Sequence, residues 1–225
     1  MKKAFTLAEV LITLGVIGVV AAMTLPSLIN NKQNKELEAA LKKNYTVINQ
    51  ALDMYQSEYG ERISKSNSDY ALLKQSLMKY MKVAADCGNS GLYYSGNKCL
   101  PKVNSAASTI FGQGYMNLNN TARIGWEYWN DGQFMLYDGT FIFIDIAFYI
   151  SVDVNGIYKK PNQLGQDVFM FQIDNNGKLL PMGAKGTKFY SDTDEYCSKT
   201  SSSNFNGAGC TVKALTDKNY FKNLP

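Results

Sequence analysis

An apolar run near the start of this chain contains one charged residue. Between Lys3 and Lys32 the only charge is Glu9, which lies at the front of the run. The twenty residues from Val10 to Ile29 are enough for a helix to cross a bilayer. An ionised carboxylate at a membrane centre costs about 2.5–3.5 kcal/mol on insertion scales, so a helix that keeps one is expected to use it. The pattern predicts a helix that meets a neighbour inside a bilayer.

The helical pattern continues beyond this run. From Lys32 to Tyr59, apolar residues recur at steps of three and four, and charged residues fill the other side. The apolar stripe consists of Leu37, Leu41, Tyr45, Ile48, Leu52, Tyr55 and Tyr59. One such stripe is typical of an amphipathic helix that packs on a folded domain. The two segments together predict a single helix of about fifty residues, which Pro26 is expected to kink or loosen.

Shorter elements follow. Apolar residues between Asp69 and Met81 predict a second, short helix. Strand-like runs cover Gly125 to Trp129, Gln133 to Tyr137, Thr140 to Ile150, Val168 to Ile173 and Lys178 to Leu180. Turn signals between them are Asn130-Asp131-Gly132, Asp138-Gly139 and Asn175-Asn176-Gly177. The sequence therefore predicts an α+β fold, in which an antiparallel sheet of about 4–5 strands packs on the helix stripe.

Composition and charge narrow the classes of function. The chain has no histidine, which excludes Ser-His-Asp and Cys-His catalysis and zinc sites that contain histidine. We therefore expect no enzyme activity. The formal net charge is +4 and falls to +2 in a product that lacks Lys2 and Lys3. A charge this small does not indicate electrostatic binding of nucleic acid.

The cysteines have no metal-like spacing. The chain contains four of them, at Cys87, Cys99, Cys197 and Cys210, without a C-x-x-C pair. An even number behind an export-like segment favours disulfides, although four free buried thiols remain an alternative. Three connectivities are open, and we favour the local pairs Cys87–Cys99 and Cys197–Cys210. Each closed loop would stabilise the fold by about 3 kcal/mol in the chain-entropy model.

Three interpretations of the N-terminal segment are open. It is a secretory signal cleaved near Val20-Ala21-Ala22, a plain membrane anchor, or a segment cut before the apolar run, which then stays as an assembly helix. An acidic residue at the start of the apolar core is unfavourable in a cleaved signal. The helical pattern also continues past the end of the run. Both features favour the third interpretation.

A family pattern matches the first residues of the chain. Lys2-Lys3-Ala4-Phe5-Thr6-Leu7-Ala8-Glu9-Val10-Leu11 resembles the class III signal of the type IV pilin and type II secretion pseudopilin superfamily. The sequence resemblance is close over about the first thirty residues, where Pro26 matches a proline of the family pattern. Over the next thirty residues only the predicted architecture is similar. It implies that a prepilin peptidase cuts between Ala4 and Phe5 and N-methylates the new amine of Phe5. Ala4 stands where the family commonly has Gly.

The resemblance also implies an organisation and a set of partners. Residues 1–4 would be a leader peptide and residues 5–29 a transmembrane and filament-core helix. Residues 30–225 would form a pilin-like globular domain that includes the amphipathic half of the helix. Glu9 would pair with the Phe5 amine of an adjacent subunit or of its own chain. Expected partners are other pilin or pseudopilin subunits, the prepilin peptidase and inner-membrane assembly machinery, with no cofactor required.

The implied location is the bacterial inner membrane, crossed once, with the globular domain in the periplasm before assembly into a filament. That filament is a cell-surface pilus or a periplasmic secretion pseudopilus. A minor pilin that binds DNA or a surface ligand from the membrane is the alternative. The positive-inside rule gives the orientation no support. The cations on the supposed outer side, Lys32, Lys35, Lys42 and Lys43, outnumber Lys2 and Lys3 on the inner side.

Two segments leave further alternatives open. Asp153, Asn155 and Asp167 could supply oxygen ligands to calcium, as in some members of the family. Their spacing does not fit the EF-hand loop, so a cluster of Asx turns is the favoured interpretation. The tail from Tyr190 to Pro225 resembles the disulfide-bounded loop of pilins. The aromatic residues of this tail, Tyr196, Phe205, Tyr220 and Phe221, would anchor it or contact a ligand.

Overall fold

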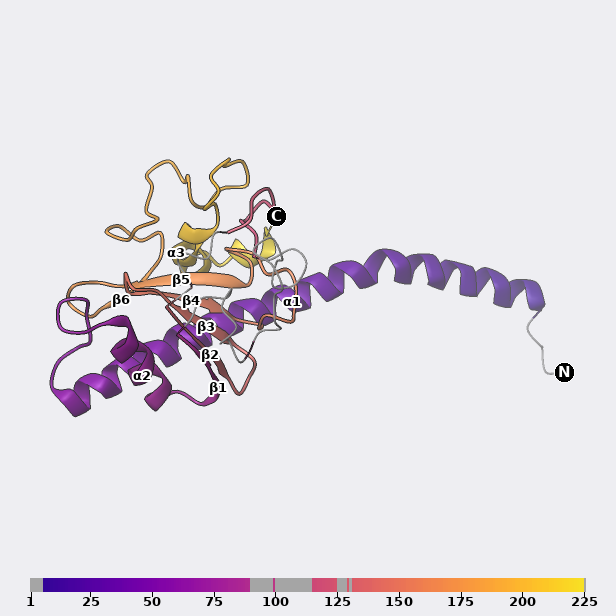
Figure 1. Ribbon diagram of the computed structural model, residues 1–225. Helices are drawn as coiled ribbons and strands as arrows, with labels where there is room; N and C mark the ends of the chain where they lie inside the picture. Colours follow the sequence, from indigo (N-terminus) through magenta and orange to yellow (C-terminus); the bar gives the residue numbers. More distant parts are fainter. Residues whose placement is uncertain (1–5, 90–98, 100–114, 125–128, 130, 225) are drawn as a thin grey trace, which may run out of the picture. The chain divides into compact units, whose positions relative to one another are not determined.

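A computed structural model describes residues 6–89, 99, 115–124, 129 and 131–224. The chain divides into two compact units, Met1–Glu36 and Leu37–Pro225. Helix α1, Leu7–Tyr59, is continuous over 53 residues, contains Pro26 and contributes to both units (Figure 1). The prediction of one helix of about fifty residues is confirmed.

In the first unit, α1 is a bare apolar helix. Its large side chains are exposed, with 77% of Leu7 and 75% of Met23 accessible. No residue of its most apolar stretch is buried, and the helix is long and apolar enough to cross a membrane. Side chains built at Gly15 or Gly18 would meet nothing within 4 Å. Within the described residues of this unit, the apolar surface of the helix is therefore left exposed.

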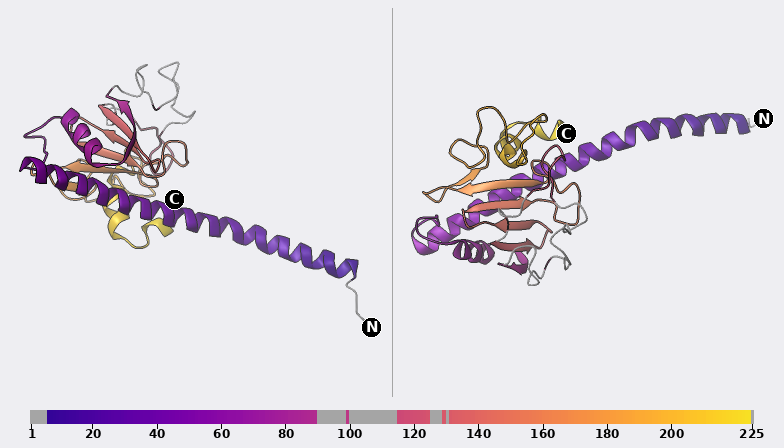
Figure 2. Two further views of the ribbon diagram at one scale, coloured as in Figure 1. Left: turned by 90° about the horizontal axis from the view of Figure 1, so that it is seen from below. Right: turned by 45° about the horizontal axis from the view of Figure 1, so that its top comes forward.

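The second unit contains one antiparallel sheet of six strands, in the order β1-β2-β3-β4-β5-β6. The strands are β1 Val83–Gly88, β2 Gly132–Leu136, β3 Phe141–Ile144, β4 Tyr149–Asp153, β5 Val168–Ile173 and β6 Leu179–Pro181. Each strand pairs with the next along the chain, as Figure 2 shows. The α+β layout is as predicted, but the prediction of four or five strands is wrong.

One reason for the difference is a turn that the sequence does not signal. Thr140 to Ile150 is predicted as a single run, yet it folds into β3 and β4. Asp145 makes the turn between them: its carboxylate accepts the N–H of Ala147 at 2.7 Å, and its carbonyl accepts the N–H of Phe148 at 2.9 Å. Phe148 has φ 65°, a conformation rarely predicted for an aromatic residue. Here a buried aspartate supplies the turn that Gly or Asn usually marks.

The second reason is the edge strand β1, for which the sequence analysis predicts no strand. Lys74 on helix α2, Tyr70–Tyr80, is buried and holds this strand. Its ammonium donates to the Asp86 carboxylate at 2.6 Å, to the Gly88 carbonyl at 2.8 Å and to the Asn89 side chain at 2.7 Å. A residue 12 positions from Asp86 thus fixes the strand, so no local pattern reveals it.

Other local predictions agree with the structure. Helix α2 begins after the N-cap Asp69, whose carboxylate accepts the N–H of Leu72 at 2.8 Å. Asp138-Gly139 joins β2 to β3, and Asn175-Asn176-Gly177 joins β5 to β6. The predicted strand at 125–129 lies outside the described residues except for Trp129, which is buried outside any strand. The turn at 130–132 is likewise only partly described.

The sheet is buried on both faces. One core lies between the stripe of α1 and alternate strand residues, with Tyr45 of α1 stacked on Phe171 at 5.7 Å between ring centroids. A second core covers the other face and includes Phe143 and Trp129, whose indole N–H donates to Ser151 at 2.7 Å. Because both faces are covered, β3 is buried at every residue. From Leu37 onward, α1 follows the apolar stripe predicted from the sequence; Tyr59 at its end is exposed.

Candidate functional site

The first turn of α1 is a capping box. The Glu9 carboxylate accepts the backbone N–H of Thr6 at 2.8 Å and its hydroxyl at 2.9 Å. In return, the Thr6 hydroxyl oxygen accepts the N–H of Glu9 at 3.3 Å. This reciprocal pair satisfies donors that a helix start leaves without partners. Ala4 and Phe5, the predicted cleavage and methylation residues, lie outside the described part of the chain.

The predicted cleavage before Phe5 would create a new N-terminus, and the capping box holds the Glu9 carboxylate close to it. The carboxylate is exposed and folds back toward Thr6, the residue that follows Phe5. A negative charge in the first turn also interacts favourably with the helix dipole. The local sequence therefore holds one carboxylate where an amine of the same or a neighbouring chain can reach it.

The two threonine hydroxyls of the apolar segment are satisfied inside the helix. The Thr13 hydroxyl donates to the Glu9 carbonyl at 2.9 Å, and the Thr24 hydroxyl donates to the Val20 carbonyl at 2.9 Å. A hydrogen bond to the carbonyl one turn earlier satisfies a hydroxyl that would lack a partner in lipid. Pro26 lacks an N–H for the ladder and remains within the helix. Glu9 is thus the one group in this segment whose charge requires an outside partner.

The second candidate site joins the ends of β4 and β5. The two carboxylates of Asp153 and Asp167 are buried there. Asp153 accepts the Tyr115 hydroxyl at 2.7 Å and the N–H of Gly156 at 2.8 Å. Asp167 accepts the N–H groups of Asn162 at 2.8 Å and Gln163 at 2.7 Å. The bond from Gly156 to Asp153 is like the Asx turns that the sequence favours for this loop, whereas Asp167 accepts from residues that precede it, which is not Asx-turn geometry.

Burial raises the pKa values of both carboxylates. Burial raises the pKa of Asp153 to about 8, and the nearby charge of Asp167 adds to the rise. Burial also raises the pKa of Asp167 to about 6, against the opposing effect of the N–H groups of Gln163 and Asn162. The pKa of Tyr115 is raised as well, because its hydroxyl is buried beside Asp153. Sequence reasoning missed Tyr115, which precedes Asp153 by 38 residues.

Two amide oxygens near this pair have no hydrogen-bond partner. They are the buried Oδ1 atoms of Asn155 and Asn162. The Asn155 side-chain amide donates to the Lys160 carbonyl at 3.3 Å, and that of Asn162 donates to the Ile157 carbonyl at 3.3 Å. Within the described residues no group of three or more His, Cys, Asp or Glu could hold a metal ion. Two carboxylates with two unpartnered amide oxygens are nevertheless the donor chemistry that calcium prefers.

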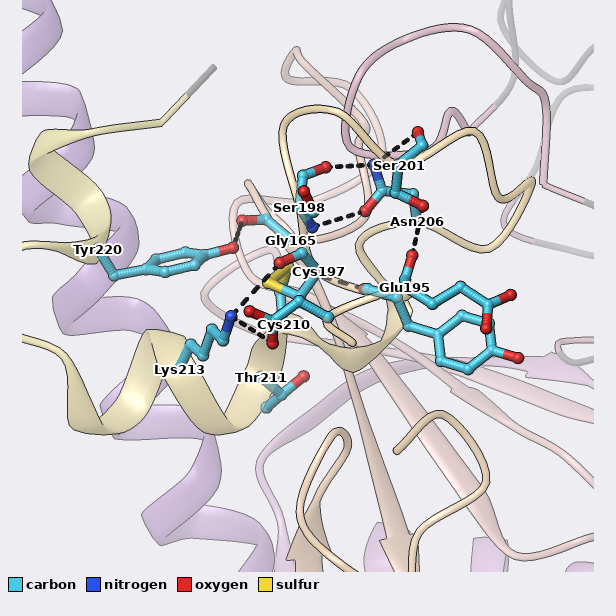
Figure 3. Close-up of a disulfide and its surroundings, with 12 residues drawn as sticks. Gly165, Glu195, Cys197, Ser198, Ser201, Asn206, Cys210, Thr211, Lys213 and Tyr220 are labelled. Atoms are coloured by element: carbon cyan, nitrogen blue, oxygen red, sulfur yellow. Dashed lines mark hydrogen bonds and ion pairs between the residues drawn. A yellow bond between two sulfur atoms is a disulfide. The ribbon is translucent and has the colours of Figure 1, made fainter. Parts of the chain in front are cut away.

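The cysteines form the two local pairs favoured from the sequence, Cys87–Cys99 and Cys197–Cys210. Figure 3 shows the second disulfide and the loop that it closes. Asn206 ties the loop together, because its side chain donates to the Ser198 carbonyl at 2.6 Å and accepts the Ser198 N–H at 3.0 Å. Outside the loop, the Asn119 side chain donates to the Ser201 carbonyl at 2.8 Å. The loop is therefore held at several points.

The aromatic residues of the tail anchor it to the domain. Tyr196 and Phe205 pack against Phe189, with ring centroids 5.2 Å apart in each pair. Phe221 is buried, and the Tyr220 hydroxyl donates to the Gly165 carbonyl at 2.6 Å. The tail also contains two 3₁₀ turns, η2 Ala208–Cys210 and η3 Tyr220–Lys222, and the short helix α3, Thr211–Thr216. Of the two roles the sequence left open, the contacts support anchoring.

Comparisons with family models, curated proteins and solved structures found no match to this chain.

The raised pKa values of Asp153 and Asp167 predict that the domain loses stability as pH rises. The folded state keeps protons between about pH 4 and 8 that the unfolded chain releases near pH 4, so folding weakens across this range. Each proton held only by the folded state contributes a slope of about 1.4 kcal/mol per pH unit. Asp153→Asn should flatten the slope, because an amide can accept from Gly156 and donate to the Tyr115 oxygen.

The measurement is chemical denaturation of the detergent-solubilised chain at steps of pH, without added calcium. Asp192→Asn, at an exposed carboxylate, is the matched control and should retain the wild-type slope. Parallel pH profiles for wild type and Asp153→Asn would show that the buried pair is not the source of the pH dependence.

Proposed function

We propose that this chain is a prepilin-like structural subunit that a prepilin peptidase processes and that then assembles into a filament. The filament is a type IV pilus-like fibre or a type II secretion pseudopilus. One observation supports this proposal above the others: a single carboxylate lies in the first turn of a helix whose most apolar stretch has no buried residue in the described part of the chain. A helix of this kind needs both a lipid-like environment and a cationic partner.

Cleavage before Phe5 would supply that cation. The new α-amine would lie next to Thr6, whose N–H and hydroxyl already hold the Glu9 carboxylate. In lipid, an amine and a carboxylate each cost several kcal/mol alone and offset this cost when paired. When the amine belongs to the adjoining subunit, the pair also fixes the axial stagger between two helices. Subunits would thus remain in the bilayer until assembly. The charge pair would then set the axial position of each helix against its neighbour in the filament.

We also propose calcium as a ligand of the loop between β4 and β5. The unpartnered oxygens of Asn155 and Asn162 support it, and so does the repulsion between the Asp153 and Asp167 carboxylates. A bound divalent cation would neutralise that repulsion and satisfy oxygen atoms that otherwise lack donors. This ligand would stabilise the globular domain and has no role in cleavage.

The processing step predicts a definite mass for the native chain. Protein purified from its own host should lack residues 1–4 and carry one added methyl group on Phe5. Intact-mass analysis with N-terminal peptide sequencing measures both. Ala4→Gly should be cut at least as completely as wild type, because Gly is the commoner residue at this position in the type IV pilin and pseudopilin superfamily, which the chain resembles. A native chain that begins at Met23 would instead identify a secretory signal, and one that retains Met1 to Ala4 would leave Glu9 without its amine.

The charge of Glu9 can be separated from its capping role. Glu9→Gln keeps an acceptor for the Thr6 N–H, so the helix start should persist, but it removes the charge. We expect this variant to insert and to be processed normally while filaments fall below detection by electron microscopy. Thr6→Ser, which retains both the cap and the charge, is the control and should assemble. Normal filaments from Glu9→Gln would refute the charge pair.

Calcium should raise the melting temperature of the wild-type domain at about pH 9, above the raised pKa values of both aspartates, where the two carboxylates repel most strongly. The rise should be absent in Asp153→Asn, and magnesium should produce little of it, because the smaller ion needs a stricter octahedral shell. Thermal unfolding with and without millimolar calcium measures this. Equal melting temperatures in both conditions would leave the loop as a cluster of Asx turns.

A further inference from the structure

Two loops of the globular domain, separate in the sequence, meet beside the Cys197–Cys210 disulfide. The first, residues 153–167, joins β4 to β5 and contains the two buried carboxylates; we call it the acid loop. The second, residues 197–210, is closed by the disulfide, and we call it the disulfide loop. Figure 3 shows Gly165 of the acid loop next to this disulfide. The two loops are therefore neighbours in the fold.

The backbones of the two loops touch where glycine leaves no side chain between them. A Cβ atom built at Gly165 would lie 3.1 Å from the Sγ atom of Cys210. A Cβ atom built at Gly207 would lie 2.4 Å from the carbonyl oxygen of Leu164. Cys210, Gly207 and Leu164 are all buried. The shape of the acid loop at this contact therefore depends on the disulfide loop staying in place.

A third segment is hydrogen-bonded to both loops. It comprises residues 115–119, just before the turn at Asn120. The N–H of Met116 donates to the carbonyl of Asn162 in the acid loop at 3.0 Å. The N–H of Leu118 donates to the carbonyl of Asn206 in the disulfide loop at 2.8 Å. Movement of the disulfide loop would therefore also reach the acid loop through this segment.

The acid loop needs this support because its own geometry is unfavourable without a cation. Asn162 is 1% exposed and has φ 57°, a left-handed conformation that is uncommon in residues other than glycine. Its Oδ1 atom, like that of Asn155, is buried without a hydrogen-bond partner. Buried oxygen atoms of this kind beside two carboxylates cost free energy while no cation or donor satisfies them. Such an arrangement persists only where the surrounding structure holds it.

We propose that the Cys197–Cys210 disulfide gates the cation site of the acid loop, which takes its ligand-binding shape only while the disulfide is closed. The inference rests on the proposed calcium site, although the coupling between the loops can be measured without calcium. Linkage makes the effect reciprocal, so calcium stabilises the disulfide against reduction by the same factor by which the closed disulfide raises calcium affinity. The site would then be completed only after oxidation, in a compartment where disulfides form.

The first test measures reduction of the full chain in detergent, at the pH of the calcium melting experiment. Dithiothreitol converts Cys197 and Cys210 to two thiols and is itself oxidised to a cyclic disulfide. Timed alkylation and peptide mass spectrometry follow the Cys87–Cys99 disulfide in the same sample. Millimolar calcium should slow reduction of Cys197–Cys210 at least about fivefold and that of Cys87–Cys99 much less. Equal slowing of both disulfides would overturn the inference, because calcium would then stabilise the domain as a whole.

A tyrosine variant tests the contact between the loops while both cysteines stay in place. The Tyr220 hydroxyl donates to the Gly165 carbonyl at 2.6 Å, and Tyr220→Phe removes this bond but keeps the ring. The variant should lose at least about half of the protection that calcium gives to Cys197–Cys210. Tyr190→Phe is the matched control, because its hydroxyl bonds Asp192 outside both loops, and it should retain wild-type protection. Full protection in Tyr220→Phe would contradict coupling through this contact.

The second test needs no cation. Hydrogen exchange compares the full wild-type chain with Cys197→Ser/Cys210→Ser and with Tyr220→Phe, in which the disulfide stays closed. The amides of Gln163 and Leu164 in the acid loop should exchange at least about threefold faster in both variants. Those of helix α2, which packs on β2, are the internal control and should be unchanged.

The two tests separate failure of the gate from failure of the calcium site. Unchanged exchange of the acid loop in both variants would overturn the gate. Faster exchange there, with no effect of calcium on either disulfide or on melting, would refute the proposed calcium site and retain the coupling between the loops.

Discussion

An ionised carboxylate in an apolar helix imposes the constraint on which this structure depends. Glu9 is satisfied locally by Thr6, but hydrogen bonds from a cap do not neutralise its charge. The same helix continues without interruption into the domain, where its stripe forms one side of the main core. One continuous helix therefore joins the residue that carries this charge to the folded domain.

Much of the fold follows from local signals in the sequence. The stripe of α1, the cap of α2 at Asp69 and the turn at Asp138-Gly139 each depend on residues within a few positions of one another. Patterns of that kind are visible without tertiary information. Strand β1 and the division between β3 and β4 are not, because a buried lysine from α2 fixes the first and a buried aspartate makes the second. A long-range ion pair therefore accounts for the first missed strand. The bonds of the second turn are local, but Phe148 with φ 65° is not a residue that marks a turn.

The candidate sites show the same division. Thr6 and Glu9 are three residues apart, so their capping box is a local pattern, and the disulfide partners are separated by only 12 and 13 positions. Asp153 and Asp167 can be noted as acidic loop residues. Their burial, and the bond from Tyr115, arise only when β4 and β5 pair and the second core closes over them. Burial is what turns two ordinary turn residues into a pair sensitive to pH.

The packing of α1 along its length has a mechanical consequence. From Leu37 to Tyr55 the helix lies on the sheet through one unbroken row of side chains, with Tyr45 stacked on Phe171 midway. A pull along the axis of this part of the helix acts parallel to this row, so it loads the contacts in shear and all at once. Separating helix from sheet would require the whole row to slide together, whereas a perpendicular force would peel it contact by contact. The domain is built to withstand tension along the axis of its own helix.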